Sequence, residues 1–257
     1  LSNERLSESQ SRAQRYDALP LSKQQRHQAL FDLLYWRTQS TGEHVSETAL
    51  TTAAKNSVGA KLALMYWYGE QQRFGEANEI YTELSALPAA QRQVLEPLLS
   101  ITQSQILTEQ NKWQQAAELL ESQQRLYPER RDLRLYLAEA LTNSNQPAKA
   151  QALLKPLTDQ QPSDRYAWQS LQLANEKIAK TTESPQLAKI VTINALRYRS
   201  HDQLWSGHYE RALTSLTQAK QLTEQMQKTA QASSARPLLA NINAEIKAVK
   251  TAKDFKP

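Results

Sequence analysis

The chain has 257 residues, of which 5 are Gly, 10 are Pro and none is Cys, so disulfides and thiolate metal sites are excluded. Glycine-rich phosphate-binding loops of the forms G-x-G-x-x-G and G-x-x-x-x-G-K-[ST] are absent, and no apolar run approaches the roughly 20 residues of a membrane helix. The formal net charge is +5, yet acidic and basic residues alternate along the chain, as in 118–132, which argues against a nucleic-acid-binding face.

The N-terminal part is predicted to be helical before any repeat begins. Ser22–Gln25 has the form of a capping box, which opens a leucine-containing helix, and Gly42 is expected to end it. Residues 1–20 are therefore predicted to form a linker and a first helix. Residues 21–56 are predicted to form helices that precede the repeats.

An internal repeat with a period of 34 residues follows. Three matching pairs have this spacing: Ala116 and Ala150, Leu120 and Leu154, Pro128 and Pro162. Thirty-four residues is the length of the tetratricopeptide (TPR) unit, in which a short turn joins two helices, A and B. Small residues lie where helices cross closely, and the proline ends helix B because it has no N–H. The predicted fold class is all-α: a right-handed, TPR-type superhelical solenoid with flanking non-repeat helices.

Four units are predicted over 57–226, namely the regular units 58–91, 97–130 and 131–164 and the irregular unit 165–226. About five residues are inserted after the first unit. In the irregular unit, position 20 falls on Ser184 in a polar loop, so helix B starts late. We expect a helix from about Pro185 to Leu204 to serve as helix B of one unit and helix A of the next. Gly207–Ala212 then forms a turn and opens the last helix B.

Residues 227–257 are predicted to form a C-terminal capping helix and a tail. A polar connector is expected at Gln231–Ser234, followed by a helix from about Pro237 to Lys250. Four apolar residues form one stripe on this helix: Leu238, Leu239, Ile242 and Ile246. Such a stripe suits a helix that covers the exposed end of a repeat array.

The candidate binding residues follow from the repeat register, because helix A positions 2, 5, 9, 12 and 13 face the concave groove of a TPR array. The projection gives Tyr66, Glu70, Gln105, Glu109, Glu139, Asn143, Leu173, Lys177, Arg197, His201 and Trp205. Acidic residues at one end and Lys177 and Arg197 at the other predict a groove with electrical polarity. Mixed polar and apolar side chains favour recognition of an extended protein segment. Tyr66 is either a partner anchor or part of the packing of Met65–Tyr68.

Both ends of the chain carry further signals. The opening segment is Leu1–Glu8, and the tail has a Gly-x-Tyr-x-x-Ala unit, a Gln/Ala-rich helix and a Phe255–Pro257 close. These segments resemble the BepA (YfgC)-like periplasmic zinc metalloproteases of Gram-negative bacteria, whose catalytic half is HtpX-like. The resemblance implies that this chain is the TPR half, with 1–20 following a protease domain that lies outside the sequence.

The resemblance also implies partners and a location. The parent would be a zinc endopeptidase and chaperone of the periplasm, associated with the outer membrane, that acts in quality control of outer-membrane β-barrel proteins. Its TPR half would bind the β-barrel assembly machinery, unfolded or stalled outer-membrane proteins and its own protease domain. Zinc is expected in the absent catalytic half, and no cofactor is expected in this chain.

No catalytic set is found in the sequence itself. H-E-x-x-H is absent, and His201 and His208 are seven residues apart with Gly207 expected to break the helix between them. We therefore expect neither an enzyme nor a metal site in this chain. Two other functions stay open: a free-standing periplasmic TPR scaffold, and a nucleic-acid-binding helical repeat, against which the interleaved acids count.

Overall fold

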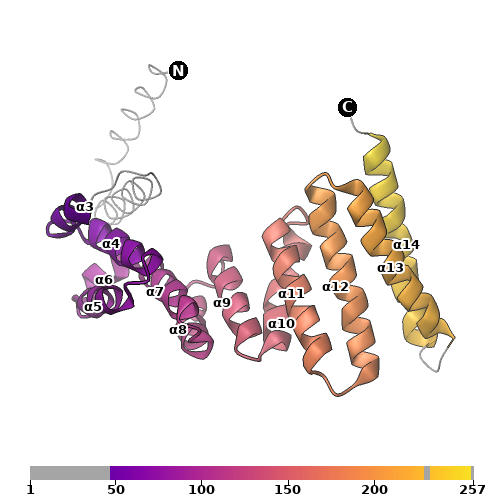
Figure 1. The fold of residues 1–257 in the computed structure, drawn as a ribbon, viewed down its shortest axis with the longest axis horizontal. Helices are drawn as coiled ribbons and strands as arrows, with labels where there is room; N and C mark the ends of the chain where they lie inside the picture. Colours follow the sequence, from indigo (N-terminus) through magenta and orange to yellow (C-terminus); the bar gives the residue numbers. More distant parts are fainter. Residues whose placement is uncertain (1–46, 229–231, 256–257) are drawn as a thin grey trace. The chain divides into compact units, whose positions relative to one another are not determined.

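The computed structural model describes residues 47–228 and 232–255. The predicted linker and early helices of 1–46 lie outside these ranges, as do Gln231 and the last two residues of the tail. The described residues form helices joined by short turns, without strands, and Figure 1 shows the helices with their labels. The chain divides into two compact units, 1–127 and 128–257, each of which is described by itself.

The first unit contains six described helices. Each of its two predicted repeats contributes a pair of consecutive helices. They are α3 (Glu47–Ala54), α4 (Val58–Glu70), α5 (Phe74–Ser85), α6 (Ala89–Leu95), α7 (Leu98–Glu109) and α8 (Trp113–Leu126). The short helix α6 begins within the predicted unit 58–91 and covers most of the segment 92–96 that was predicted as an insertion between two units. The pairs α4/α5 and α7/α8 fall within the predicted units 58–91 and 97–130.

The second unit contains the other six described helices. They are α9 (Arg131–Asn143), α10 (Pro147–Gln160), α11 (Arg165–Thr181), α12 (Pro185–Trp205), α13 (Tyr209–Gln227) and α14 (Ala232–Asp254). Each packs against the next along the chain, and α9 also contacts α11. The 21-residue helix α12 packs against both α11 and α13, which confirms the predicted helix shared by two neighbours. This sequential packing is the architecture of a TPR-type helical solenoid.

Four inter-helix turns, those that follow α4, α7, α9 and α12, share one backbone conformation, which the turn between α11 and α12 lacks. Each contains a residue with positive φ, between 57° and 73°: Gln72, Asn111, Asn145 and Gly207. The next amide then donates a hydrogen bond to a carbonyl five residues earlier, as His208 N does to Gln203 O at 2.8 Å. This is the Schellman arrangement, which satisfies the last carbonyls of helix A. Asn and Gly adopt the left-handed region at little cost, so three of the four turns have a residue suited to it.

Close helix crossings in the first unit depend on small residues. A Cβ added at Gly69 of α4 would lie 2.8 Å from Ile106 Cγ1 of α7, so the glycine allows these two helices to approach. Met65 of the aromatic segment is fully buried in the same core. The Tyr68 hydroxyl donates to Glu47 at 3.2 Å, and the Arg73 guanidinium lies 4.4 Å from the Tyr68 ring centroid. Most of Met65–Tyr68 is therefore packing, whereas Tyr66 is half-buried on α4.

The C-terminal helix departs from the prediction at its start. α14 begins at Ala232, so the predicted polar connector is wrong for the residues from Ala232 to Ser234. Ala235 is completely buried in a core with Leu216, Met226 and other apolar residues, and this burial favours an additional helical turn before Pro237. Pro237 stands inside the helix near its start, where little of the helical hydrogen-bond ladder precedes it.

Candidate functional site

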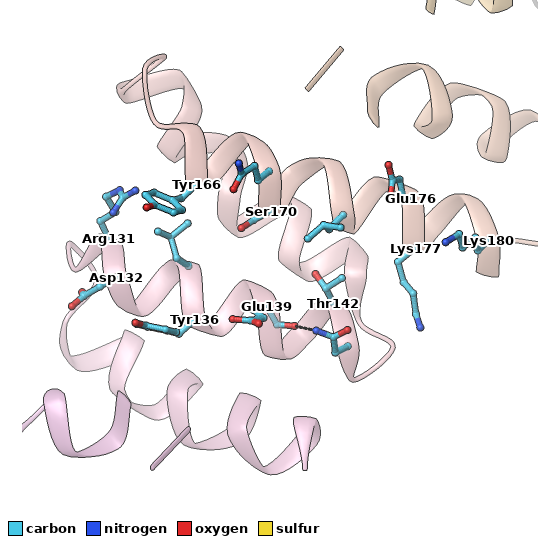
Figure 2. A pocket seen from close by; sticks show the side chains of 14 residues that line it. Arg131, Asp132, Tyr136, Glu139, Thr142, Tyr166, Ser170, Glu176, Lys177 and Lys180 are labelled. Carbon is cyan, nitrogen blue, oxygen red and sulfur yellow. Dashed lines mark hydrogen bonds between the residues drawn. The ribbon is translucent and has the colours of Figure 1, made fainter. Parts of the chain in front are cut away.

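A groove lies between α9 and α11, the first helices of two adjacent repeats in the second unit. It encloses about 750 Å³, and Figure 2 shows side chains from both helices lining it. α9 has 13 residues and α11 has 17, so each wall is one continuous helix, and α10 connects the two along the chain. Rigid walls of this kind fix the spacing between side chains that a bound segment would contact.

Most of the residues that line the groove stand at the repeat positions that were predicted to face it. Positions 2, 5, 9, 12 and 13 of the two helices are Asp132, Leu135, Glu139, Thr142, Asn143, Tyr166, Gln169, Leu173, Glu176 and Lys177, and all of them line the groove. Four of the predicted site residues, Glu139, Asn143, Leu173 and Lys177, are thus brought together. Arg131, Tyr136, Ser170 and Lys180 complete the lining and were not predicted. Tyr136 and Ser170 both stand at position 6, so the repeat period relates them although the register omitted that position.

One end of the groove is aromatic. Tyr136 and Tyr166 lie on opposite helices at this end (Figure 2), and Leu135 lies one residue from Tyr136. The Tyr166 side chain is 69% exposed, and Leu173, further along the same helix, is 57% exposed. Large apolar side chains left in water within a concave site are the usual anchors of protein recognition.

The charges at the aromatic end are already paired. Arg131 donates two hydrogen bonds to Asp164, at 2.5 and 2.6 Å, and Asp132 accepts hydrogen bonds from Arg130. Asp164 also caps α11 by accepting from the Ala167 amide at 3.1 Å. Burial raises the pKa of Asp164, but the hydrogen bonds from Arg131 and Ala167 outweigh it, so the pKa lies below its ordinary value. This end therefore has a fixed geometry and little uncompensated charge.

The opposite end of the groove is basic. Lys177 and Lys180 lie there in Figure 2, and neither ammonium group has a hydrogen-bond or ion-pair partner within the described ranges 47–228 and 232–255. Glu176 does not neutralise them, because Arg199 of α12 donates to its carboxylate at 2.7 Å. The groove thus combines an aromatic end with an unpaired positive end.

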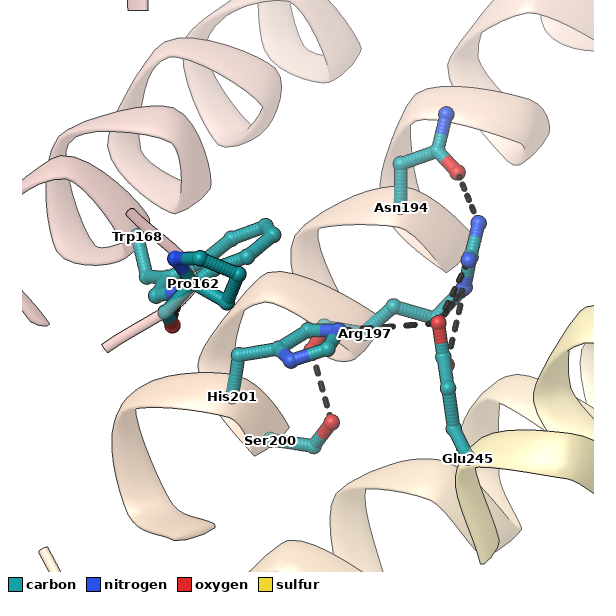
Figure 3. A network of polar contacts seen from close by, with 7 residues as sticks. All are labelled: Pro162, Trp168, Asn194, Arg197, Ser200, His201 and Glu245. Carbon is teal, nitrogen blue, oxygen red and sulfur yellow. Dashed lines mark hydrogen bonds and ion pairs between the residues drawn. The ribbon is translucent and has the colours of Figure 1, made fainter. Parts of the chain in front are cut away.

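Two further predicted residues, Arg197 and His201 of α12, contact the C-terminal helix instead of lining the groove. Figure 3 shows Arg197 joined to Glu245 of α14, with Nη2 at 2.5 Å from Oε1 and Nε at 3.0 Å from Oε2. His201 Nε2 lies 3.5 Å from the same carboxylate. Burial raises the pKa of Glu245, but the hydrogen bonds from His201 and Arg197 lower it by more than burial raises it. The net pKa of Glu245 is therefore below its ordinary value.

The His201 ring is also held from its other side. It stacks on the Trp168 indole with a centroid distance of 4.2 Å and an interplanar angle of 10°. The indole N–H donates to the Pro162 carbonyl at 2.7 Å. Arg197 and His201 therefore tie α14, α12 and α11 together, and the predicted basic end of the groove consists of Lys177 and Lys180 rather than Lys177 and Arg197.

The remaining predicted residues are not among those that line the groove. Tyr66 and Glu70 lie on α4, and Gln105 and Glu109 on α7, all within the first unit. The two glutamates are exposed, and Tyr66 and Gln105 are half-buried. Trp205 ends α12 and is 48% exposed. Their part in binding stays a prediction.

Over 47–228 and 232–255, no cluster of three His, Asp or Glu side chains is placed to hold a metal ion. No helix in the same part of the chain combines the length and apolar character needed to cross a membrane.

The comparison with known families agrees with the repeat geometry. Residues 107–174 match the tetratricopeptide repeat family, and this segment contains α9, α10 and the part of α11 that carries Tyr166 and Leu173. A comparison with curated proteins gives no match. The chain thus contains tetratricopeptide repeats in a TPR-type helical solenoid, and such repeats make a protein–protein interaction domain.

Proposed function

We propose that this chain is the docking half of a periplasmic zinc metalloprotease and chaperone of the BepA-like type. In this role it binds the outer-membrane β-barrel assembly machinery and unfolded or stalled outer-membrane proteins, and presents them to its own protease domain. The sequence resemblance at Leu1–Glu8 and Phe255–Pro257 supports the choice of parent. The zinc would be bound by that catalytic half.

The observation that carries the docking role is the groove between α9 and α11. A volume of about 750 Å³ with exposed Tyr166 and Leu173 suits the side chains of an extended protein segment. The polar groups that line it, such as Asn143 and Gln169, suit hydrogen bonds that set the orientation of a bound chain. These features favour recruitment of a protein substrate rather than chemistry on it.

The parent is tested by the reading frame upstream of Leu1. An H-E-x-x-H motif followed by a glutamate ligand supports the protease, and zinc-dependent cleavage of a denatured outer-membrane protein by the intact parent would then be measured. A signal peptide placed directly before Leu1 contradicts the protease and leaves the free-standing periplasmic scaffold. In the protease, a Leu173→Asp change is expected to slow cleavage of the recruited protein while leaving cleavage of a short unrecruited peptide unchanged.

A further inference from the structure

The groove is short along its helices and its lining does not extend onto α12. The 13 residues of α9 span about 20 Å, at about 1.5 Å per residue. An extended chain advances about 3.3 Å per residue, so this wall accommodates about six residues. The next helix along the chain, α12, has Arg197 and His201 at repeat positions 5 and 9. Both side chains contact Glu245 of α14, so they do not extend the binding surface.

The charge along the groove is uneven, which restricts what can bind. Ion pairs neutralise Arg131 and Asp132 at the aromatic end, whereas Lys177 and Lys180 are unpaired within the described part of the chain. A carboxylate bound near the lysines gains favourable Coulomb energy, whereas one bound at the neutralised aromatic end gains little. Acidic groups of a ligand are therefore favoured at the lysine end.

We propose that the α9–α11 groove receives an extended segment of about six residues that has apolar side chains at one end and carboxylates at the other. The apolar side chains pack against Leu135, Tyr136 and Tyr166, and the carboxylates contact Lys177 and Lys180. This inference rests on the proposed docking function and specifies the chemistry of the bound partner. Charge complementarity to the two unpaired lysines is the observation that selects this occupant over a uniformly apolar one.

The test uses the full chain and fluorescein-labelled hexapeptides in anisotropy titrations. The first probe has Leu and Phe at one end, two Ser in the middle and two Glu at the other end. A second probe replaces both Glu by Gln, and a third moves the two Glu to the middle, away from the lysines. We expect saturable binding of the first probe that weakens as salt is raised from about 50 mM to about 500 mM. The second and third probes are expected to bind at least about tenfold more weakly, about 1.4 kcal/mol.

Matched variants locate the binding site. Lys177→Glu combined with Lys180→Glu is expected to weaken the first probe at least about tenfold. The control, Lys149→Glu combined with Lys155→Glu, makes the same charge change on exposed positions of α10 outside the groove lining and should leave affinity within about twofold. Circular dichroism shows whether both variants keep the wild-type helix content.

Three results would overturn the inference: no saturable binding of the first probe, equal affinity for the first two probes, or equal effects of the two charge reversals. These outcomes leave the proposed function open to its own test. If photo-crosslinking from Leu173 in the intact parent still captures a protein while the hexapeptide fails to bind, docking stands and the proposed ligand chemistry is wrong. If neither is seen, both fail.

Discussion

The Arg131–Asp164 pair provides the sharpest test of how the groove is held open. The Asp164 side chain is only 1% exposed, caps α11 and accepts two hydrogen bonds from Arg131, whose own side chain is 43% exposed. Losing a helix cap costs about 1 kcal/mol. Hydrogen bonds to charged groups contribute about 1.5–3 kcal/mol, and here the lower end applies because the released guanidinium returns to water.

Asp164→Ala removes the cap and the ion pair, so we expect the free energy of unfolding to fall by about 2–3 kcal/mol. Asp164→Asn keeps a good capping side chain and loses only the charge, so the expected loss is about 1–2 kcal/mol. Urea titrations followed by circular dichroism measure both values. An alanine variant within about 0.5 kcal/mol of wild type, or an asparagine variant as unstable as alanine, would refute the reasoning.

The same pair makes the free energy of unfolding depend on pH. The folded pKa of Asp164 lies below its ordinary value of about 3.9, so the ionised form contributes stability that is complete above about pH 5. This contribution is lost as the pH falls through the folded pKa. The stability difference between wild type and Asp164→Asn should therefore be constant from about pH 7 to about pH 5 and shrink below about pH 4. A difference that grows on acidification would contradict the assignment.

Two further predictions concern packing and the C-terminal helix. Gly69→Ala should destabilise by about 1–3 kcal/mol, because its Cβ would lie 2.8 Å from a buried isoleucine of α7. Gly75→Ala is the control, since a Cβ at that position meets nothing within 4 Å, and this variant should be more stable than wild type by up to about 1 kcal/mol. Thermal unfolding measures both variants, and equal effects of the two changes would exclude the close crossing of α4 and α7. Glu245→Gln should destabilise by about 2–4 kcal/mol, because it leaves Arg197 unpaired where both side chains are 17% exposed. The exposed Glu224→Gln is its control in urea titrations, and a Glu245 variant no less stable than that control would mean that the pair does not hold α14.

The repeat period predicted the groove better than the individual residues did. A spacing of 34 residues places Leu135 opposite Gln169 and Glu139 opposite Leu173 without any knowledge of distant contacts. The four turns that contain a positive-φ residue follow from the same local regularity. Position 6 was omitted from the register, which is why Tyr136 was missed.

The parts that were wrong or incomplete depend on contacts distant in the sequence. Arg197 and Glu245 are 48 residues apart, and their pairing depends on how α14 packs on α13. No periodic pattern encodes that distance. The early start of α14 likewise follows from the burial of Ala235 in the tertiary core, which overrides the polar composition of the preceding residues.

The central claim is that the α9–α11 groove is the surface that binds protein partners. A photo-reactive amino acid placed at Leu173 tests it most directly, with Ala152 on the exposed side of α10 as the matched control. In cells that express the intact parent, we expect protein adducts from Leu173, fewer adducts when Lys177 and Lys180 are changed to Glu, and none from Ala152. Adducts that form equally at both positions, or at Ala152 alone, would contradict it.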